Sequence, residues 1–121
     1  MPRLTRIHHV QLAMPRGEEA RARVFYEKGL GLTEMNKPDD QRDDGGVWFE
    51  GGEIRLLIGV ERVFTAAASA HPAFQVEGLS DLRRHLASMG HRTHDAPTVD
   101  GLARCHVLDP FGNRIELLEQ G

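Results

Sequence analysis

Two histidines, a glutamate and an arginine occupy repeat-related positions, and the two imidazoles and the carboxylate could together form a metal site. The segment Ile-Arg-Leu-Leu that contains Arg55 returns as Ile-Glu-Leu-Leu around Glu116, an offset of 61 residues. His9, near the start of one apolar run, returns as His71 near the start of another, an offset of 62 residues. These similar offsets indicate a duplicated module whose equivalent strands would face each other across a cup. Two imidazoles and a carboxylate in such a cup suit a divalent transition metal.

The size and charge of the chain favour a single domain that binds a small molecule. At 121 residues and 13.5 kDa it can enclose one core, so we expect one domain over 1–121. The net charge of -3, with both signs interspersed, offers no cationic surface for nucleic acid or anionic membranes. The absence of a long apolar stretch and of a leader at Met1 predicts a cytoplasmic protein. Cys105 is the only cysteine, which excludes an internal disulfide and a thiolate zinc cluster.

Hydrophobic periodicity predicts one strand, one helix and three strands, in that order, twice over. The fold class is therefore α+β, with two βαβββ modules forming a curved eight-stranded mixed sheet. The first module covers about 5–60, a connector covers 61–69, and the second module covers about 70–119. The polar run 37–46, rich in aspartate and glycine, is expected to be an exposed loop. The predicted strands are 7–14, 32–37, 47–50, 53–60, 71–76, 91–94, 104–108 and 114–118, and the predicted helices are 18–28 and 79–89, the second with Ser80 as N-cap.

Strand alternation places the candidate ligands on one side of the sheet. Glu116 lies between apolar neighbours that share a face, so it takes the opposite face, and Arg55 does so for the same reason. The helices need the apolar faces, which leaves the polar side chains on an open face. In the last hairpin either Cys105 or His106 faces this way, and alternation does not choose between them. The predicted open-face residues are His9, Gln11, Arg55, His71, Gln75 and Glu116.

These features resemble the vicinal oxygen chelate superfamily, which includes glyoxalase I, bleomycin-resistance proteins, fosfomycin-resistance enzymes, methylmalonyl-CoA epimerase and extradiol dioxygenases. The resemblance rests on the paired modules, the start His-Val-Gln-Leu-Ala at 9–13 and the terminal Leu-Asp-Pro-Phe-Gly-Asn-Arg-Ile-Glu-Leu at 108–117. It implies the glyoxalase/bleomycin-resistance fold and a divalent metal held by His9, His71 and Glu116. It also implies a homodimer, because members of this length are usually homodimers and some exchange modules between chains.

Arg55 departs from the glyoxalase I pattern, which places a further carboxylate or a glutamine ligand at this position. Arginine keeps its charge and cannot ligate a metal. The resemblance therefore implies a three-ligand site for Zn, Ni, Mn, Co or Fe, with open positions for a substrate that chelates through two neighbouring oxygens. Arg55 could grip an anionic substrate through a bidentate contact, or it could pair with Glu116 in a site that holds no metal.

The expected chemistry is stabilisation of negative charge on a metal-bound oxygen, with a nearby group that moves a proton. Glu116 is the candidate catalytic residue, and His106 and Tyr26 are the other titratable candidates. The glutamines can only orient a substrate by hydrogen bonds. The expected substrate contacts are Arg55, Gln11, Gln75, Trp48 and His106.

Three functions follow from this pattern. The first is a metal-dependent, glyoxalase-like lyase, isomerase or transferase acting on a small oxygenated metabolite. The second is a metal-free drug-binding or natural-product-binding protein of the bleomycin-resistance type, which Arg55 favours. The third is an iron-dependent extradiol dioxygenase, ranked last because the additional catalytic histidine and tyrosine of such enzymes have no counterpart that we can place in this sequence.

Overall fold

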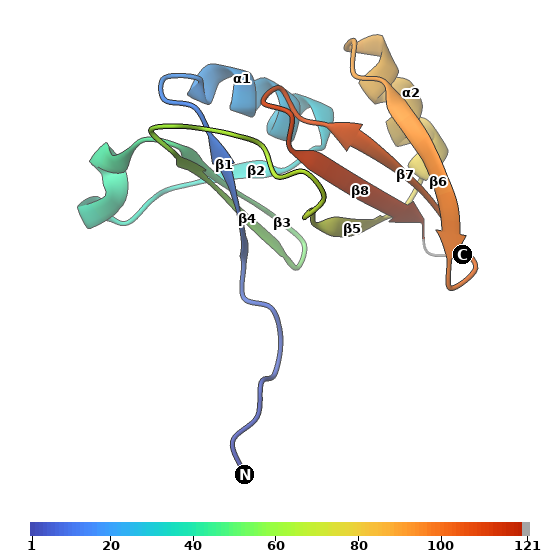
Figure 1. Cartoon of the computed structure of the whole chain (residues 1–121), viewed down its shortest axis with the longest axis horizontal. Helices are drawn as coiled ribbons and strands as arrows, with labels where there is room; N and C mark the ends of the chain where they lie inside the picture. Colours follow the sequence, from blue (N-terminus) through green and yellow to red (C-terminus); the bar gives the residue numbers. More distant parts are fainter. Residues whose placement is uncertain (120–121) are drawn as a thin grey trace.

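The chain folds into the two βαβββ modules that the sequence predicts (Figure 1). The computed structural model describes residues 1–119. Each module forms its own four-stranded sheet, in the orders β1-β4-β3-β2 and β5-β8-β7-β6. The first strand of each module runs parallel to the last, and the remaining pairs are antiparallel. The strands are β1 (Val10–Met14), β2 (Thr33–Met35), β3 (Val47–Gly51), β4 (Ile54–Val60), β5 (Ala73–Val76), β6 (Thr93–Val99), β7 (Leu102–Leu108) and β8 (Arg114–Glu119).

The first predicted helix consists of two different helical segments. Helix α1 (Glu19–Arg23) continues directly into η1 (Val24–Gly29), a π-helix. The amide of Leu30 donates to the carbonyl of Phe25, five residues back, at 2.9 Å, which is the wider π pattern. Within the acidic run that was expected to be a loop, a short exposed 3-10 helix, η2 (Asp39–Asp44), interrupts the irregular backbone.

Helix α2 (Leu79–Ser88) begins at a different cap from the predicted Ser80. Gly78 occupies the N-cap position with a φ of 79°, which glycine adopts without steric cost. The carboxylate of Glu119, at the end of β8, accepts hydrogen bonds from the amides of Gly78 and Leu79, each at 3.1 Å. These amides would otherwise lack partners at the start of the helix. A carboxylate from a neighbouring strand therefore replaces the local cap.

The apolar faces of both sheets pack with the helices into one continuous core. Phe49 and Leu56 face this core from the first sheet, and Leu117 faces it from the second. Cys105 is fully buried in the same core, so strand alternation turns its neighbour His106 to the open face. His106, rather than Cys105, is therefore the open-face residue of the last hairpin.

A buried carboxylate in the turn between β7 and β8 joins the two modules. Asp109 accepts four hydrogen bonds, from the amides of Phe111 and Asn113, from the side-chain amide of Asn113, and from the hydroxyl of Tyr26 at 2.7 Å. Asn113 also donates to the carbonyl of Ala13 in the first module. Burial, followed by the charge of Asp109, raises the pKa of Tyr26 well above its ordinary value. Tyr26 therefore serves the core and does not act as a proton donor in the candidate site.

The first nine residues form an arm that projects away from the body of the molecule (Figure 1). The predicted strand from residue 7 begins only at Val10, because Val10 pairs with Leu56 and β4 itself begins just two residues earlier. Leu4 is fully exposed on this arm and Ile7 is largely exposed. In the described part of the chain, 1–119, no helix is long and apolar enough to cross a bilayer. The expected cytoplasmic location stays a prediction.

Candidate functional site

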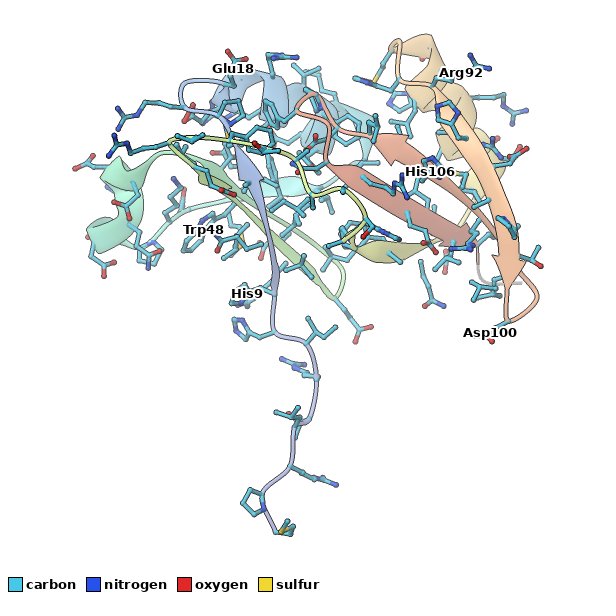
Figure 2. All side chains as sticks on the ribbon, in the orientation of Figure 1. His9, Glu18, Trp48, Arg92, Asp100 and His106 are labelled. Atoms are coloured by element: carbon cyan, nitrogen blue, oxygen red, sulfur yellow. The ribbon has the colours of Figure 1, made fainter. Side chains whose placement is uncertain are left out.

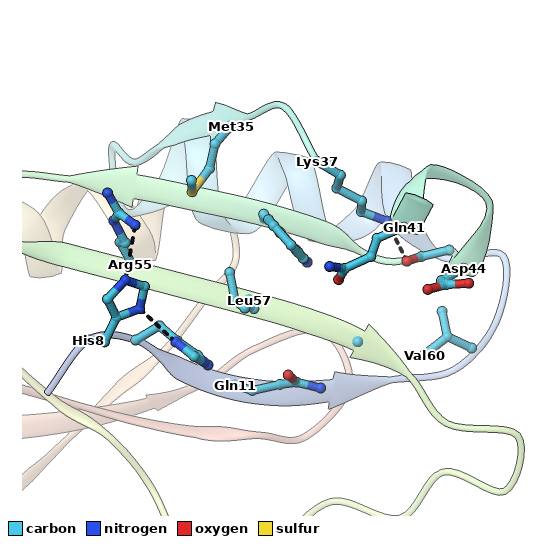
Figure 3. Close-up of a pocket in the computed structure, with 13 residues that line it drawn as sticks. His8, Gln11, Met35, Lys37, Gln41, Asp44, Arg55, Leu57 and Val60 are labelled. Atoms are coloured by element: carbon cyan, nitrogen blue, oxygen red, sulfur yellow. Dashed lines mark hydrogen bonds between the residues drawn. The ribbon is translucent and has the colours of Figure 1, made fainter. Parts of the chain in front are cut away.

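The open face of the first sheet carries a pocket of about 500 Å³ (Figure 3). Gln11 of β1, Arg55 and Leu57 of β4 and Trp48 of β3 come from adjacent strands and form its floor, and η2 lies at one end. Four of the predicted site residues therefore lie together, as alternation requires. They are His9, Gln11, Trp48 and Arg55.

Gly59 leaves the space that Gln11 occupies on this floor. A Cβ atom at residue 59 would lie 2.7 Å from the side-chain nitrogen of Gln11, closer than such atoms approach. A larger residue at 59 would therefore require the side-chain amide of Gln11 to shift.

Two adjacent histidines line the same pocket beside Arg55. The Nδ1 atoms of His8 and His9 lie 3.0 Å apart, and Arg55 lies within 3.4 Å of His8 Nε2 (Figure 3). Alternation assigns His8 to the face opposite His9. That rule holds only within a paired strand, however, and both histidines precede β1. His8 is therefore a pocket residue that the sequence reasoning missed.

The open face of the second sheet carries His71 and Glu116 in direct contact. His71 Nε2 lies 2.9 Å from Glu116 Oε1, and Arg104 donates to the same oxygen at 3.0 Å. Glu116 is only 6% exposed, so its charge has little access to water. The other ring nitrogen of His71, Nδ1, lies 2.6 Å from the carbonyl of Ser69. A carbonyl can only accept, so this contact places a proton on Nδ1.

Glu116 is ionised although it is buried. Burial acts to raise its pKa, but the hydrogen bonds from His71 and Arg104, and then their charges, outweigh burial and lower the pKa from its ordinary value. The carboxylate is thus ionised at neutral pH. Arg104 gave no signal in the sequence, because its contact with Glu116 depends on the pairing of β7 with β8.

His106 lies on this open face opposite Glu116, as the register of β7 and β8 shows. Its ring stacks on that of His94 from β6, with centroids 5.4 Å apart. Burial, followed by the charges of Arg114 and His94, lowers the pKa of His106. Gln75 is less central: it is exposed on the edge strand β5 and lines a separate small pocket of about 230 Å³.

The predicted ligands are thus divided between two sheets. His9 directly precedes β1 of the first sheet, whereas His71 precedes β5 and Glu116 lies on β8 of the second. Figure 2 shows His9 well apart from His106, which pairs with Glu116. Across residues 1–119 of one chain, no three histidine, cysteine, aspartate or glutamate side chains gather closely enough to hold a metal. The three-ligand set stays a prediction that a single chain does not complete.

Comparison with known proteins identifies the family. The model of the Glyoxalase/Bleomycin resistance protein/Dioxygenase superfamily matches residues 6–117. The chain belongs to this superfamily. A glyoxalase family protein from Bacillus anthracis is 39% identical, with a TM-score of 0.95, over 100% of this chain and 99% of that chain. The predicted family and fold are therefore confirmed.

More distant members of the glyoxalase superfamily share the fold alone. The fosfomycin resistance protein FosX from Listeria monocytogenes is 14% identical, with a TM-score of 0.77, over 98% of this chain and 96% of that chain. A glyoxalase family protein from Enterococcus faecalis is 24% identical, with a TM-score of 0.69, over 94% and 97%. No curated protein matches this chain.

The donors on the second sheet have the chemistry that a divalent metal requires, and members of this superfamily commonly use such a metal. Because Nδ1 of His71 donates to the carbonyl of Ser69, Nε2 is the ring nitrogen that faces Glu116, and in place of its hydrogen bond to Glu116 it could bind a metal. An imidazole lone pair and a carboxylate are ligands that Zn, Ni, Mn, Co and Fe accept. Two of the three predicted ligands thus fit a metal, and His9 as the third stays a prediction.

Proposed function

We propose that this protein is a metal-dependent, glyoxalase-like lyase, isomerase or transferase acting on a small oxygenated metabolite that chelates the metal through neighbouring oxygens. The observation that carries the proposal is the orientation of His71, whose hydrogen bond to Ser69 directs Nε2 at the ionised Glu116. Such a bond to the second ring nitrogen is the usual way in which proteins orient a metal-binding histidine.

In this proposal His9, His71 and Glu116 hold the metal, which supplies Lewis-acid stabilisation of a substrate oxygen. Glu116 is also the candidate group that moves a proton, since it is ionised at neutral pH. Arg55 and Gln11 are placed to bind and orient the substrate from the first sheet, where Trp48 offers a flat apolar wall.

Metal analysis of untagged protein tests this proposal. We expect close to one equivalent of transition metal per chain, and loss of most of it in His9→Ala and in His71→Ala, because each change removes one of three ligands. The matched control is His85→Ala, an exposed histidine on α2 that contacts the carbonyl of Lys28. Wild-type protein that takes up no metal from any of the five candidate ions would contradict the proposal.

A metal-free binding protein is the second candidate, and Arg104 is the observation that favours it. Arg104 donates to the same oxygen of Glu116 that His71 contacts, so the carboxylate already has a cationic partner within the chain. Stoichiometric binding of an aromatic drug by metal-free protein would support this candidate. Cleavage of catechol rings after addition of ferrous iron would instead support dioxygenase chemistry.

We also propose a homodimer in which a second copy completes the site. His9 is separated from His71 and Glu116 within one chain, and the free edges β1 and β5 line a largely apolar groove of about 870 Å³. Ile7 of the projecting arm lines this groove and is largely exposed, and Leu4 further along the arm is fully exposed. Free sheet edges and uncovered apolar side chains are features that association covers.

Mixing two inactive variants tests whether the site is shared. His9→Ala and His71→Ala protomers, unfolded and refolded together, should recover about a quarter of the wild-type metal content, because each mixed dimer of a twofold pair regains one intact site. Each variant refolded alone should recover none, and light scattering should show twice the mass of one chain. Mixed protein that binds no more metal than the separate variants would exclude a shared site.

A further inference from the structure

Arg114 lies on the open face of the second sheet and has no partner among the residues that the structure describes. It lies on β8 opposite Leu108 and two residues before Glu116, so both side chains project to the same face. Its Nε is buried and has no hydrogen-bond partner. Within residues 1–119 its guanidinium takes part in none of the hydrogen bonds or ion pairs that the structure contains.

The neighbours of Arg114 do not neutralise its charge. His106 is paired across the strands with Glu116 and stacks on His94. The pairing of β7 with β8 places His106 diagonally across from Arg114, and alternation puts both side chains on the same face. The single carboxylate of this group, Glu116, is already shared by His71 and Arg104. The open face of the second sheet thus carries one guanidinium, that of Arg114, with no carboxylate among the described residues left to pair with it.

Only Nε of Arg114 is buried; its terminal nitrogens, which contact no acceptor within residues 1–119, can donate to a ligand from outside the chain. Guanidinium donors match the two oxygens of a carboxylate, phosphonate or phosphate through parallel charge-assisted bonds. The neighbouring imidazoles can donate further hydrogen bonds to the same oxygens. A small oxyanion is therefore the ligand that this group of side chains fits.

We propose that Arg114, with His106 and His94, binds an oxyanionic group of the substrate. That the bound anion is part of a substrate rests on the proposed function. Residues two apart on a strand lie about 7 Å from one another, so Arg114 would hold the anion about that far from Glu116. The substrate class is then a small acid whose anionic group lies only a few bonds from the oxygens that chelate the metal.

Titration calorimetry with inorganic phosphate and with acetate, on protein treated with a chelator, tests this site without the metal. We expect saturable binding of at least one of the two anions, weakened about tenfold or more in Arg114→Gln, because a charge-assisted contact contributes at least that factor. Tighter phosphate would indicate a phosphate or phosphonate substrate, and tighter acetate a carboxylate. Arg92→Gln, which removes an exposed charge elsewhere, should bind like the wild type (Figure 2).

Arg114→Lys keeps the charge but loses the planar guanidinium that can donate two parallel hydrogen bonds. Its affinity for the anion should therefore fall between those of Arg114→Gln and the wild type. Thermal melts of each variant show whether the fold is kept. The proposal is overturned if the wild type binds neither anion, or if folded Arg114→Gln binds them equally well. Absence of metal binding would count against the proposed function alone, because the anion titration needs no metal.

Discussion

Replacing Asp109 with alanine should lower the free energy of unfolding by about 3–5 kcal/mol, because it leaves several buried donors without an acceptor. The substitution removes all four hydrogen bonds that Asp109 accepts, including the one from Tyr26 of the first module. Urea denaturation followed by circular dichroism measures the loss. The exposed Asp95, paired with Arg83, provides the control, and Asp95→Ala should change the same quantity by about 1 kcal/mol or less.

Two milder variants distinguish the contribution of the turn to stability from that of the contact between the modules. Asp109→Asn keeps one carbonyl acceptor for the amides of the turn, so it should be less damaging than alanine. Tyr26→Phe removes only the hydroxyl, at a cost of about 1–2 kcal/mol. A loss in Asp109→Ala no greater than that in Tyr26→Phe would show that the turn does not depend on this carboxylate.

Replacing Glu116 with glutamine should weaken metal binding at least about 100-fold, since even changes to groups around metal ligands can cost 10–100-fold. Glutamine has nearly the same shape and can still accept the hydrogen bond from Arg104, so the fold should be kept. The variant loses the negative charge that the wild type carries at neutral pH. Competition with a fluorescent chelator measures the affinity for zinc.

Glu50→Gln is the matched control for this experiment, because Glu50 is an exposed carboxylate on β3 of the other sheet. It should bind zinc as the wild type does. If folded Glu116→Gln also bound zinc with wild-type affinity, Glu116 would not be a ligand, and the metal-free candidate would become the better explanation of its contact with Arg104.

The architecture could be predicted because two independent patterns agree. Strand alternation and the internal repeat both place the same residues on the open faces of the sheets. Arg55 and Glu116, flanked by apolar residues, do lie on the open faces of β4 and β8. Boundaries were less accurate where pairing decides them. Strand β6 extends to Val99 through Pro97, which is tolerated because β6 lies at the edge of its sheet. The strand propensities of the residues in that segment do not predict a strand of seven residues.

The candidate site could be predicted only in part, because contacts between distant residues have no local signal. Trp48 and Gln11, two of the predicted substrate contacts, line one pocket with His9. The partner of Glu116 on its own sheet, Arg104, depends on the register of β7, and the isolation of Arg114 depends on what surrounds it in space. The separation of His9 from His71 follows from how the two modules pack, which alternation along single strands cannot describe.

The location of His9 at the base of the projecting arm has a thermodynamic consequence. If its metal partners belong to another copy of the chain, ion uptake and self-association are linked equilibria, and each must strengthen the other by the same factor. Dilution would then release the ion, and the ion would in turn hold protomers together at concentrations where they otherwise separate. The concentration of the protein would then determine what fraction of it holds the ion.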